Sequence, residues 1–128
     1  MLMSKVVLAG VLGVGLLLAA PAASAHHSFA MFDYAKNVTM NGTIKEFQWT
    51  NPHAWIQLVV RDPATGKDIE WSIECGSPNM MARQGWKRES LKAGDKVTLV
   101  IHPLKTGQMG GSMVSAVVNG VPVGAPGL

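Results

Sequence analysis

The stretch Asn37–Trp49 (NVTMNGTIKEFQW) decides the fold that the sequence predicts. Apolar or small residues alternate with polar ones along most of its length, which is the pattern of a strand with one buried face. Phe47 and the tryptophan that ends the stretch stand on the opposite parity from Ile44. Such a change of phase indicates a bulge or a strong bend, near Gly42 or Glu46. We therefore expect a long, strongly bent first strand.

Four more strands and one short helix are expected after this strand. The helix begins after the N-cap Ser77, has Pro78 at its first position and has Gly85 as the C′ residue just past its end. The strands are expected at 53–61, 68–74, 96–102 and 112–118. Five short strands with a helix between strands three and four describe an all-β fold, a small closed barrel of the OB (oligonucleotide/oligosaccharide-binding) type. A β-sandwich is the alternative, although it generally has about seven strands.

The first 25 residues have the pattern of a cleavable signal peptide. One positive charge at Lys5 precedes an uncharged apolar run over 6–20, and Ala23-Ser24-Ala25 supplies the small residues that signal peptidase needs. The run is shorter than the roughly 20 apolar residues of a membrane-spanning helix. We expect export, cleavage after Ala25, no membrane span in the mature chain, and one β-barrel domain over 26–128.

Charge and cysteine content narrow the classes of function. The mature chain keeps ten of the eleven Lys and Arg residues against eight Asp and Glu, and the basic residues are scattered. Because nucleic-acid binders usually show a clustered basic stripe, we expect no nucleic-acid partner. Cys75 is the only cysteine, so it has no internal disulfide partner. It is expected to be a buried small hydrophobe, with a free thiol for a metal or another chain as the alternative.

The sequence offers little that indicates catalysis. Glu70 and Glu74 alternate on one face of the third strand and are interpreted as a solvated edge. Gly107, Gly110 and Gly111 are interpreted as turn formers between two strands. No nucleophile elbow, P-loop or H-E-x-x-H motif occurs in the sequence, so an enzyme is not the favoured hypothesis.

Several blocks of the mature chain resemble a known family. The first is HHSFAMFD at 26–33, and the second is FQWTNPHAW at 47–55. Ser77-Pro78-Asn79, RQGW at 83–86 and LKAGDKV at 91–97 follow in order. In combination they resemble a family of small exported proteins of Gram-negative bacteria that is known as a domain of unknown function. The resemblance implies a periplasmic location and a small barrel-like β fold, and it implies no activity.

The four histidines carry the leading functional hypothesis. Cleavage after Ala25 would make His26 the amino terminus, so that its α-amine and its ring nitrogen form a chelate on one residue. A third nitrogen would complete a histidine brace, a planar nitrogen set that favours Cu(II). His53, which follows a proline at a strand start, is the preferred third ligand, His102 is the second choice, and His27 is a further assisting ligand. The alternative is that all four histidines are purely structural.

These patterns leave several functions open. A copper carrier or accessory protein of the periplasm is the first, and a metal-free periplasmic binding module for a partner protein or small ligand is the alternative. A copper oxygenase is disfavoured because so small a barrel has little room for a substrate surface. The methionines at 80, 81, 109 and 113 could offer thioethers to Cu(I), although methionine is more often core filler.

Overall fold

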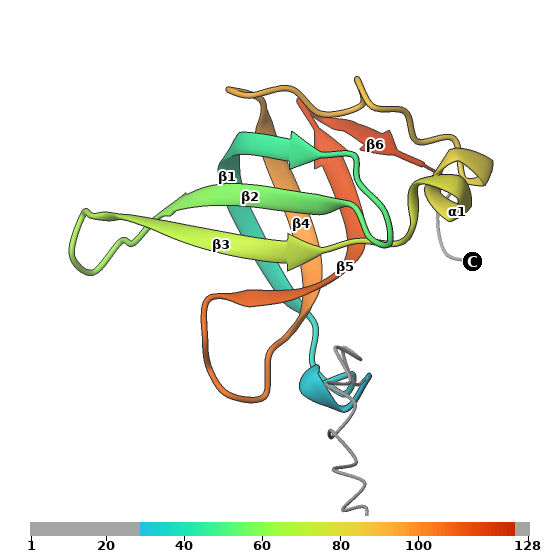
Figure 1. Cartoon of the computed structure of the whole chain (residues 1–128). Helices are drawn as coiled ribbons and strands as arrows, with labels where there is room; N and C mark the ends of the chain where they lie inside the picture. Colours follow the sequence, from blue (N-terminus) through green and yellow to red (C-terminus); the bar gives the residue numbers. More distant parts are fainter. Residues whose placement is uncertain (1–28, 125–128) are drawn as a thin grey trace, which may run out of the picture.

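The structure is a computed structural model that describes residues 29–124. It is almost entirely β, with one short α-helix and one 3-10 turn (Figure 1). In chain order the elements are η1 (Phe29–Met31), β1 (Val38–Gln48), β2 (Trp55–Arg61), β3 (Asp68–Glu74), α1 (Pro78–Arg83), β4 (Lys96–Pro103), β5 (Gly110–Val118) and β6 (Val121–Val123).

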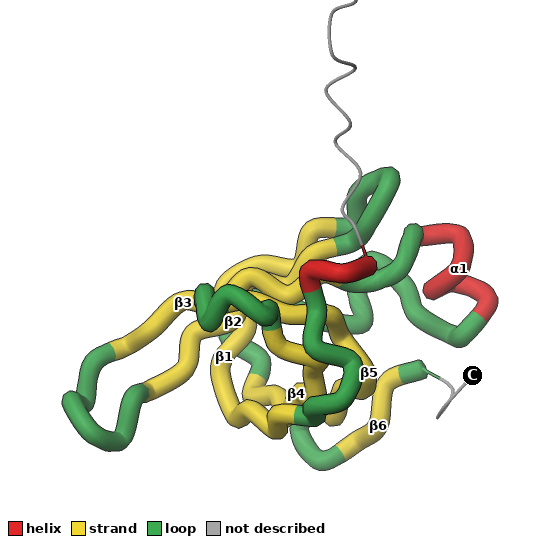
Figure 2. The backbone as a smooth tube through the Cα atoms, turned by 90° about the horizontal axis from the view of Figure 1, so that it is seen from below, coloured by secondary structure: helices red, strands yellow, loops and turns green. Residues whose placement is uncertain are grey.

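The first five strands close into a barrel, as the sequence predicts. The antiparallel order is β3-β2-β1-β4-β5, and a short parallel pairing of β3 with β5 joins the two ends of the sheet. The helix α1 lies between β3 and β4 in the chain, and in space it lies to one side of the barrel (Figures 1 and 2). Closure pairs the edges that an open sheet of this size would expose.

One strand was not predicted. β6 follows the turn at Asn119–Gly120 and pairs with the end of β5 as a hairpin outside the closed barrel. It is only three residues long and contains Pro122, so the sequence has no alternating pattern there that could indicate a strand.

The bend in β1 is present and has a bulge at the predicted place. The register of the pairing with β2 shifts between Ile44 and Glu46. These two residues pair with successive residues of β2, and Lys45 between them is the extra residue of the bulge. The first half of β1 pairs with β4 and the second half with β2, so the strand takes part in both sides of the barrel. At Gly42 a Cβ atom would lie 2.7 Å from the Val59 carbonyl oxygen, so glycine is required where the two strands approach each other.

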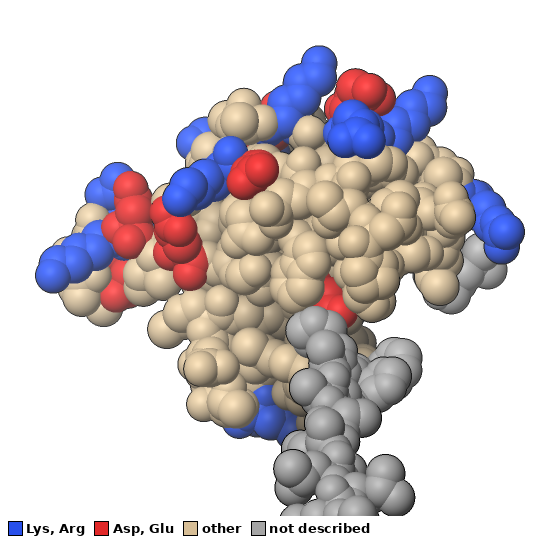
Figure 3. All heavy atoms as spheres, in the orientation of Figure 1, with Lys and Arg blue, Asp and Glu red and all other residues tan. Residues whose placement is uncertain are grey.

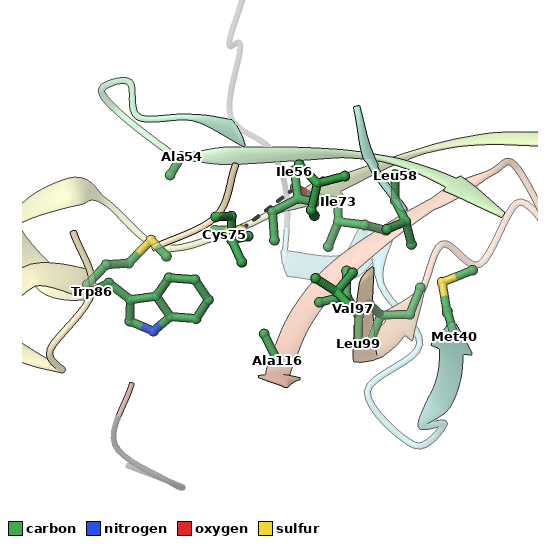
Figure 4. Packing of buried hydrophobic residues seen from close by; sticks show 14 residues of the cluster. Met40, Ala54, Ile56, Leu58, Ile73, Cys75, Trp86, Val97, Leu99 and Ala116 are labelled. Atoms are coloured by element: carbon green, nitrogen blue, oxygen red, sulfur yellow. Dashed lines mark hydrogen bonds between the residues drawn. The ribbon is translucent and has the colours of Figure 1, made fainter. Parts of the chain in front are cut away.

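The interior of the barrel is filled by aliphatic side chains that alternate along the strands. Fully buried residues come from all sides of the barrel: Ile44, Ile56, Leu58, Ile73, Leu99 and Ile101. Cys75 joins this core as expected, near Trp86 in the view of Figure 4, and its Sγ–H donates to the Ile73 carbonyl oxygen at 3.8 Å. Burial, with a smaller contribution from the charge of Glu74, raises the pKa of the Cys75 thiol to about 12. The thiol therefore stays protonated at neutral pH.

The helix has the predicted start. Ser77 has an extended backbone, its Oγ accepts the Met80 backbone N–H, and Pro78 occupies the first position. The helix ends at Arg83 with Gln84 as its cap, and Gly85 follows with φ +90°. It is a six-residue element, and within residues 29–124 no helix is long and apolar enough to cross a bilayer.

Barrel closure depends on glycine at the start of β5, which gives a first prediction. A Cβ atom at Gly111 would lie 2.5 Å from the His102 carbonyl oxygen and 2.7 Å from Ile101 Cδ1. Gly111→Ala should therefore lower the free energy of unfolding by about 1–3 kcal/mol, as overpacking does in other interiors. Urea denaturation followed by circular dichroism measures this change. Gly76→Ala is the matched control, because its nearest neighbour is Met81 Cγ at 3.4 Å and its stability should stay within about 1 kcal/mol of the parent. Equal effects of the two substitutions would contradict the role of Gly111.

Candidate functional site

A row of four residues crosses the outside of the barrel at the end where β3 and β4 finish. Trp55 of β2 pairs with Glu74 of β3, Glu74 pairs with Ser112 of β5, and Ser112 pairs with His102 of β4. Directly opposite residues share one face of a sheet. Side chains alternate between the two faces of a strand. The sequence neighbours Ile56, Ile73 and Ile101 point into the core, so the row faces away from the barrel interior.

His102 is held by the segment that leads into β1. This lead-in segment, residues 29–37, runs antiparallel to the end of β4, and the Asp33 N–H donates to the Pro103 carbonyl oxygen at 2.8 Å. The Tyr34 ring meets the His102 ring edge to face, with 5.0 Å between centroids. His102 Nδ1 lies 2.9 Å from the Lys36 carbonyl oxygen. A carbonyl oxygen only accepts hydrogen bonds, so Nδ1 carries the hydrogen and Nε2 is the other ring nitrogen, with its lone pair available.

His53 is held in the same way at the start of β2. Its Nδ1 lies 3.0 Å from the Cys75 carbonyl oxygen and 3.6 Å from Glu74 Oε1. Backbone hydrogen bonds join Ala54 to both Cys75 and Gly76, so the residue beside His53 is fixed against the end of β3. The His53 side chain is 39% exposed. Its Nδ1–H therefore points to the barrel, and Nε2 keeps its lone pair.

Glu74 corrects the interpretation of the third strand as a solvated edge. Its side chain is only 8% exposed, and within residues 29–124 its Oε2 has no hydrogen-bond partner. Glu70, on the same strand, is exposed and pairs with Lys45 Nζ at 2.6 Å. The two carboxylates differ because closure places β5 beside the last residues of β3, whereas the first part of β3 belongs to the protruding hairpin.

The structure places two of the four predicted metal ligands at the same end of the barrel, but not next to each other. His53 and His102 lie at the same end of the barrel, on either side of Glu74 and Ser112. His102 and Glu74 are two strands apart, or about 10 Å between Cα atoms at the usual strand spacing. Within residues 29–124 no group of three His, Cys, Asp or Glu residues could hold a metal ion. His26, His27 and the predicted signal peptide at 1–25 lie outside the described residues.

Three of the four methionines named above line one pocket. Met80, Met81 and Met113 surround a space of about 330 Å³ between α1, β5 and β6. Met113 Sδ lies 3.9 Å from Cys75 Sγ, but the high pKa of this thiol keeps it from acting as a thiolate ligand. Met109 is exposed in the loop before β5 and lines no part of this pocket. Met81 belongs to the core under α1 and Met113 packs against it, whereas Met80 is exposed.

A larger groove lies away from the histidines. It has a volume of about 670 Å³ and is lined by residues of β1, β2, β4 and β5 and by the turn before β6. Its rim includes the base of the β2–β3 hairpin, where Arg61 Nε pairs with Asp68 Oδ1 at 2.9 Å. Charged side chains of both signs gather over this hairpin, at the left of Figure 3. At the tip of the hairpin, hydrogen bonds from the Ala64 N–H and the Thr65 hydroxyl lower the pKa of Asp62.

Comparison with known proteins identifies the family. No curated protein and no solved structure matches the chain. A family model described as a family of unknown function (DUF6152) matches residues 14–113, which include β1 to β4, α1 and both predicted histidine positions of the barrel. The chain therefore belongs to this family of unknown function.

Proposed function

We propose that the protein is exported to the periplasm and that its mature form binds copper through an N-terminal histidine site, as a carrier or accessory protein. The observation that carries the proposal is the way in which the barrel holds His53. Its Nδ1–H donates to the Cys75 carbonyl oxygen, Glu74 Oε1 lies 3.6 Å from the same nitrogen, and Nε2 has no hydrogen-bond partner within residues 29–124. Histidines that bind metals almost always donate their other ring N–H to a carbonyl or a carboxylate in this manner.

The ring of the second histidine of the barrel, His102, is oriented in the same way. His102 donates its Nδ1–H to the Lys36 carbonyl oxygen, and the ring is packed against Tyr34. Two imidazoles at one end of the barrel are thus fixed in the tautomer that offers Nε2. His53 remains the preferred third ligand and His102 the second choice, because of these two only His53 has a carboxylate of residues 29–124 within 4 Å of its donating nitrogen.

The remaining ligands must come from the segment before Phe29. Residues 29–124 contain no complete set of three ligands, so a metal site needs the amine and ring of His26, with His27 assisting. The lead-in segment is attached along the end of β4, beside His102, by the Lys105 N–H to the Met31 carbonyl oxygen at 2.9 Å. His26 stands three residues before Phe29, and three residues of chain reach up to about 10 Å.

The chemistry of this ligand set favours copper over other metals. It consists of one amine and imidazole nitrogens, without a thiolate, since the Cys75 thiol stays protonated. Nitrogen donors in a planar set suit Cu(II), which also has the highest affinity in the series of divalent first-row metals. When bound, the metal would supply a one-electron redox centre or simply be the cargo that the protein carries.

The first test of the copper site replaces the histidine of the barrel. The mature chain is prepared from His26, its start is checked by intact mass, and Cu(II) is titrated with electron paramagnetic resonance as the readout. His53→Ala should weaken Cu(II) binding by more than the ~10–100-fold that loss of an outer-shell partner costs. His102→Ala should have a smaller effect, and Cys75→Ala should leave the spectrum unchanged. Unaltered affinity in His53→Ala would contradict the assignment of His53 as a ligand.

The second test alters the amino terminus and leaves every side chain in place. Acetylation of the His26 α-amine removes the chelate between the α-amine and the ring of the same residue. The affinity for Cu(II) should then fall by at least about tenfold, which corresponds to roughly 1.4 kcal/mol. The number of nitrogen ligands in the hyperfine pattern should fall by one. A mature form that starts at another residue in cells would refute an N-terminal site.

A metal-free binding module is the second candidate, and the groove of about 670 Å³ favours it. This volume lies within the range of sites for small molecules, about 300–1,000 Å³. Thr43, Lys96 and Thr98 bring polar groups to its wall, so a small polar ligand fits better than an apolar one. Amide chemical shifts recorded with a panel of sugars and amino acids would detect such a ligand. Under this alternative the ligand binds equally well to a His26→Ala, His53→Ala double variant.

A further inference from the structure

The unsatisfied carboxylate of Glu74 is the feature that the copper proposal does not explain. The side chain is more than nine-tenths buried on the outer face of the barrel, and its Oε2 has no hydrogen-bond partner within residues 29–124. Burying a charged group without a partner is costly, and native proteins rarely leave such an atom unsatisfied. The atom therefore marks a place where a hydrogen-bond donor is missing.

The neighbours of Glu74 do not supply that donor. His53 Nδ1 is 3.6 Å from Oε1, and its hydrogen is directed to the nearer Cys75 carbonyl oxygen at 3.0 Å. The Cys75 thiol donates to the Ile73 carbonyl oxygen inside the barrel. Among the described residues, the Lys and Arg side chains with ion pairs are engaged with Asp33, Glu70 and Asp68. Within residues 29–124, Glu74 thus has no Lys or Arg partner, and its ion-pair contact there is with His53 Nδ1 at 3.6 Å.

We propose that Glu74 Oε2 is the receptor for one ammonium group. The group needs a positive charge, because a neutral donor such as a hydroxyl would not offset the buried carboxylate. It also needs an N–H group, because Oε2 lacks a hydrogen-bond donor within residues 29–124. Charge-assisted N–H···O bonds are stronger than bonds between neutral groups. Residues 29–124 provide no three-residue ligand group around Glu74, so an ammonium fits the site better than a metal ion held by these side chains.

Two sources can supply this ammonium. One is the α-amino group of the mature chain, a source that rests on the cleavage after Ala25 in the proposed function. The lead-in segment and Glu74 share one end of the barrel, since the row from Glu74 through Ser112 to His102 ends beside Tyr34. The other source is a small primary amine bound from solution. Copper binding would convert the ammonium of the terminus into a coordinated amine, so the terminus is either an ammonium on Glu74 or a copper ligand that keeps two N–H groups to donate.

The test is a comparison of thermal unfolding in the absence of metal, with a chelator present throughout. Four forms of the mature chain are used: the parent and Glu74→Gln, each with a free and with an acetylated His26. Glu46→Gln, which alters an exposed carboxylate on β1, is the matched control. Because no copper is present, the result does not depend on whether the metal site exists.

If the free terminus binds Glu74, the effects of acetylation and of Glu74→Gln on the midpoint of unfolding should not be additive. Acetylation should lower the midpoint of unfolding of the parent by about 4 °C or more, the shift that one lost interaction of this strength causes in a domain of this size. In Glu74→Gln the free and acetylated forms should unfold at the same temperature. In Glu46→Gln the difference should remain as large as in the parent. The comparison within the parent needs no side-chain variant, so a folding defect in Glu74→Gln would leave it valid.

A second set of measurements, with small amines added, tests whether the ammonium comes from solution when acetylation has no effect. Methylammonium should then raise the unfolding midpoint of the parent, and the rise should be absent in Glu74→Gln. Tetramethylammonium, which has the charge but no N–H, should not reproduce it. If neither the terminus nor methylammonium stabilises the parent, the carboxylate has no ammonium partner and the proposal is overturned.

Discussion

The short parallel pairing of β3 with β5 is the constraint on which the rest of this structure depends. It involves only Ser72–Glu74 and Gly110–Ser112, yet it turns an open sheet into a closed barrel. The close approach has a steric condition, because a side chain at Gly111 would collide with the backbone of β4. The pairing also builds the candidate site: it places Glu74 beside Ser112, and through Ser112 beside His102. Fold and site therefore have the same origin.

This dependence explains which parts of the fold could be predicted from the sequence. The bulge in β1 and the cap of α1 are local features, and the patterns around Ile44 and Ser77 predict them correctly. Gly110 and Gly111 were interpreted as turn formers, and this was wrong: they are buried strand residues. Their role follows from contacts with β3 and β4, which no local pattern reveals. β6 was missed because three residues are too few to show a period.

The candidate site shows the same division between local and distant information. His53 could be singled out because it follows Pro52 at the start of a strand. The group that orients its ring, the Cys75 carbonyl oxygen, lies 22 residues further along the chain, and the corresponding separation for His102 and Lys36 is 66 residues. Glu74 was misjudged for a related reason. Alternation along β3 predicts which residues share its face, but it does not show that the end of β3 is paired with the distant strand β5.

The arrangement at this end of the barrel also limits what can bind there. His53 and His102 each donate their Nδ1–H to a backbone carbonyl oxygen. Within residues 29–124, Glu74 Oε2 has no hydrogen-bond donor. Among residues 29–124, the end of the barrel therefore presents the second ring nitrogens of two histidines and one carboxylate oxygen without a donor. Such a surface selects against anions and in favour of a compact cation, whether that cation is a metal ion or an ammonium group. The two proposals are for this reason physically related. A copper ion held by the terminal amine would bring an N–H donor and a positive charge to the same place, and an uncoordinated terminus would bring both without the metal.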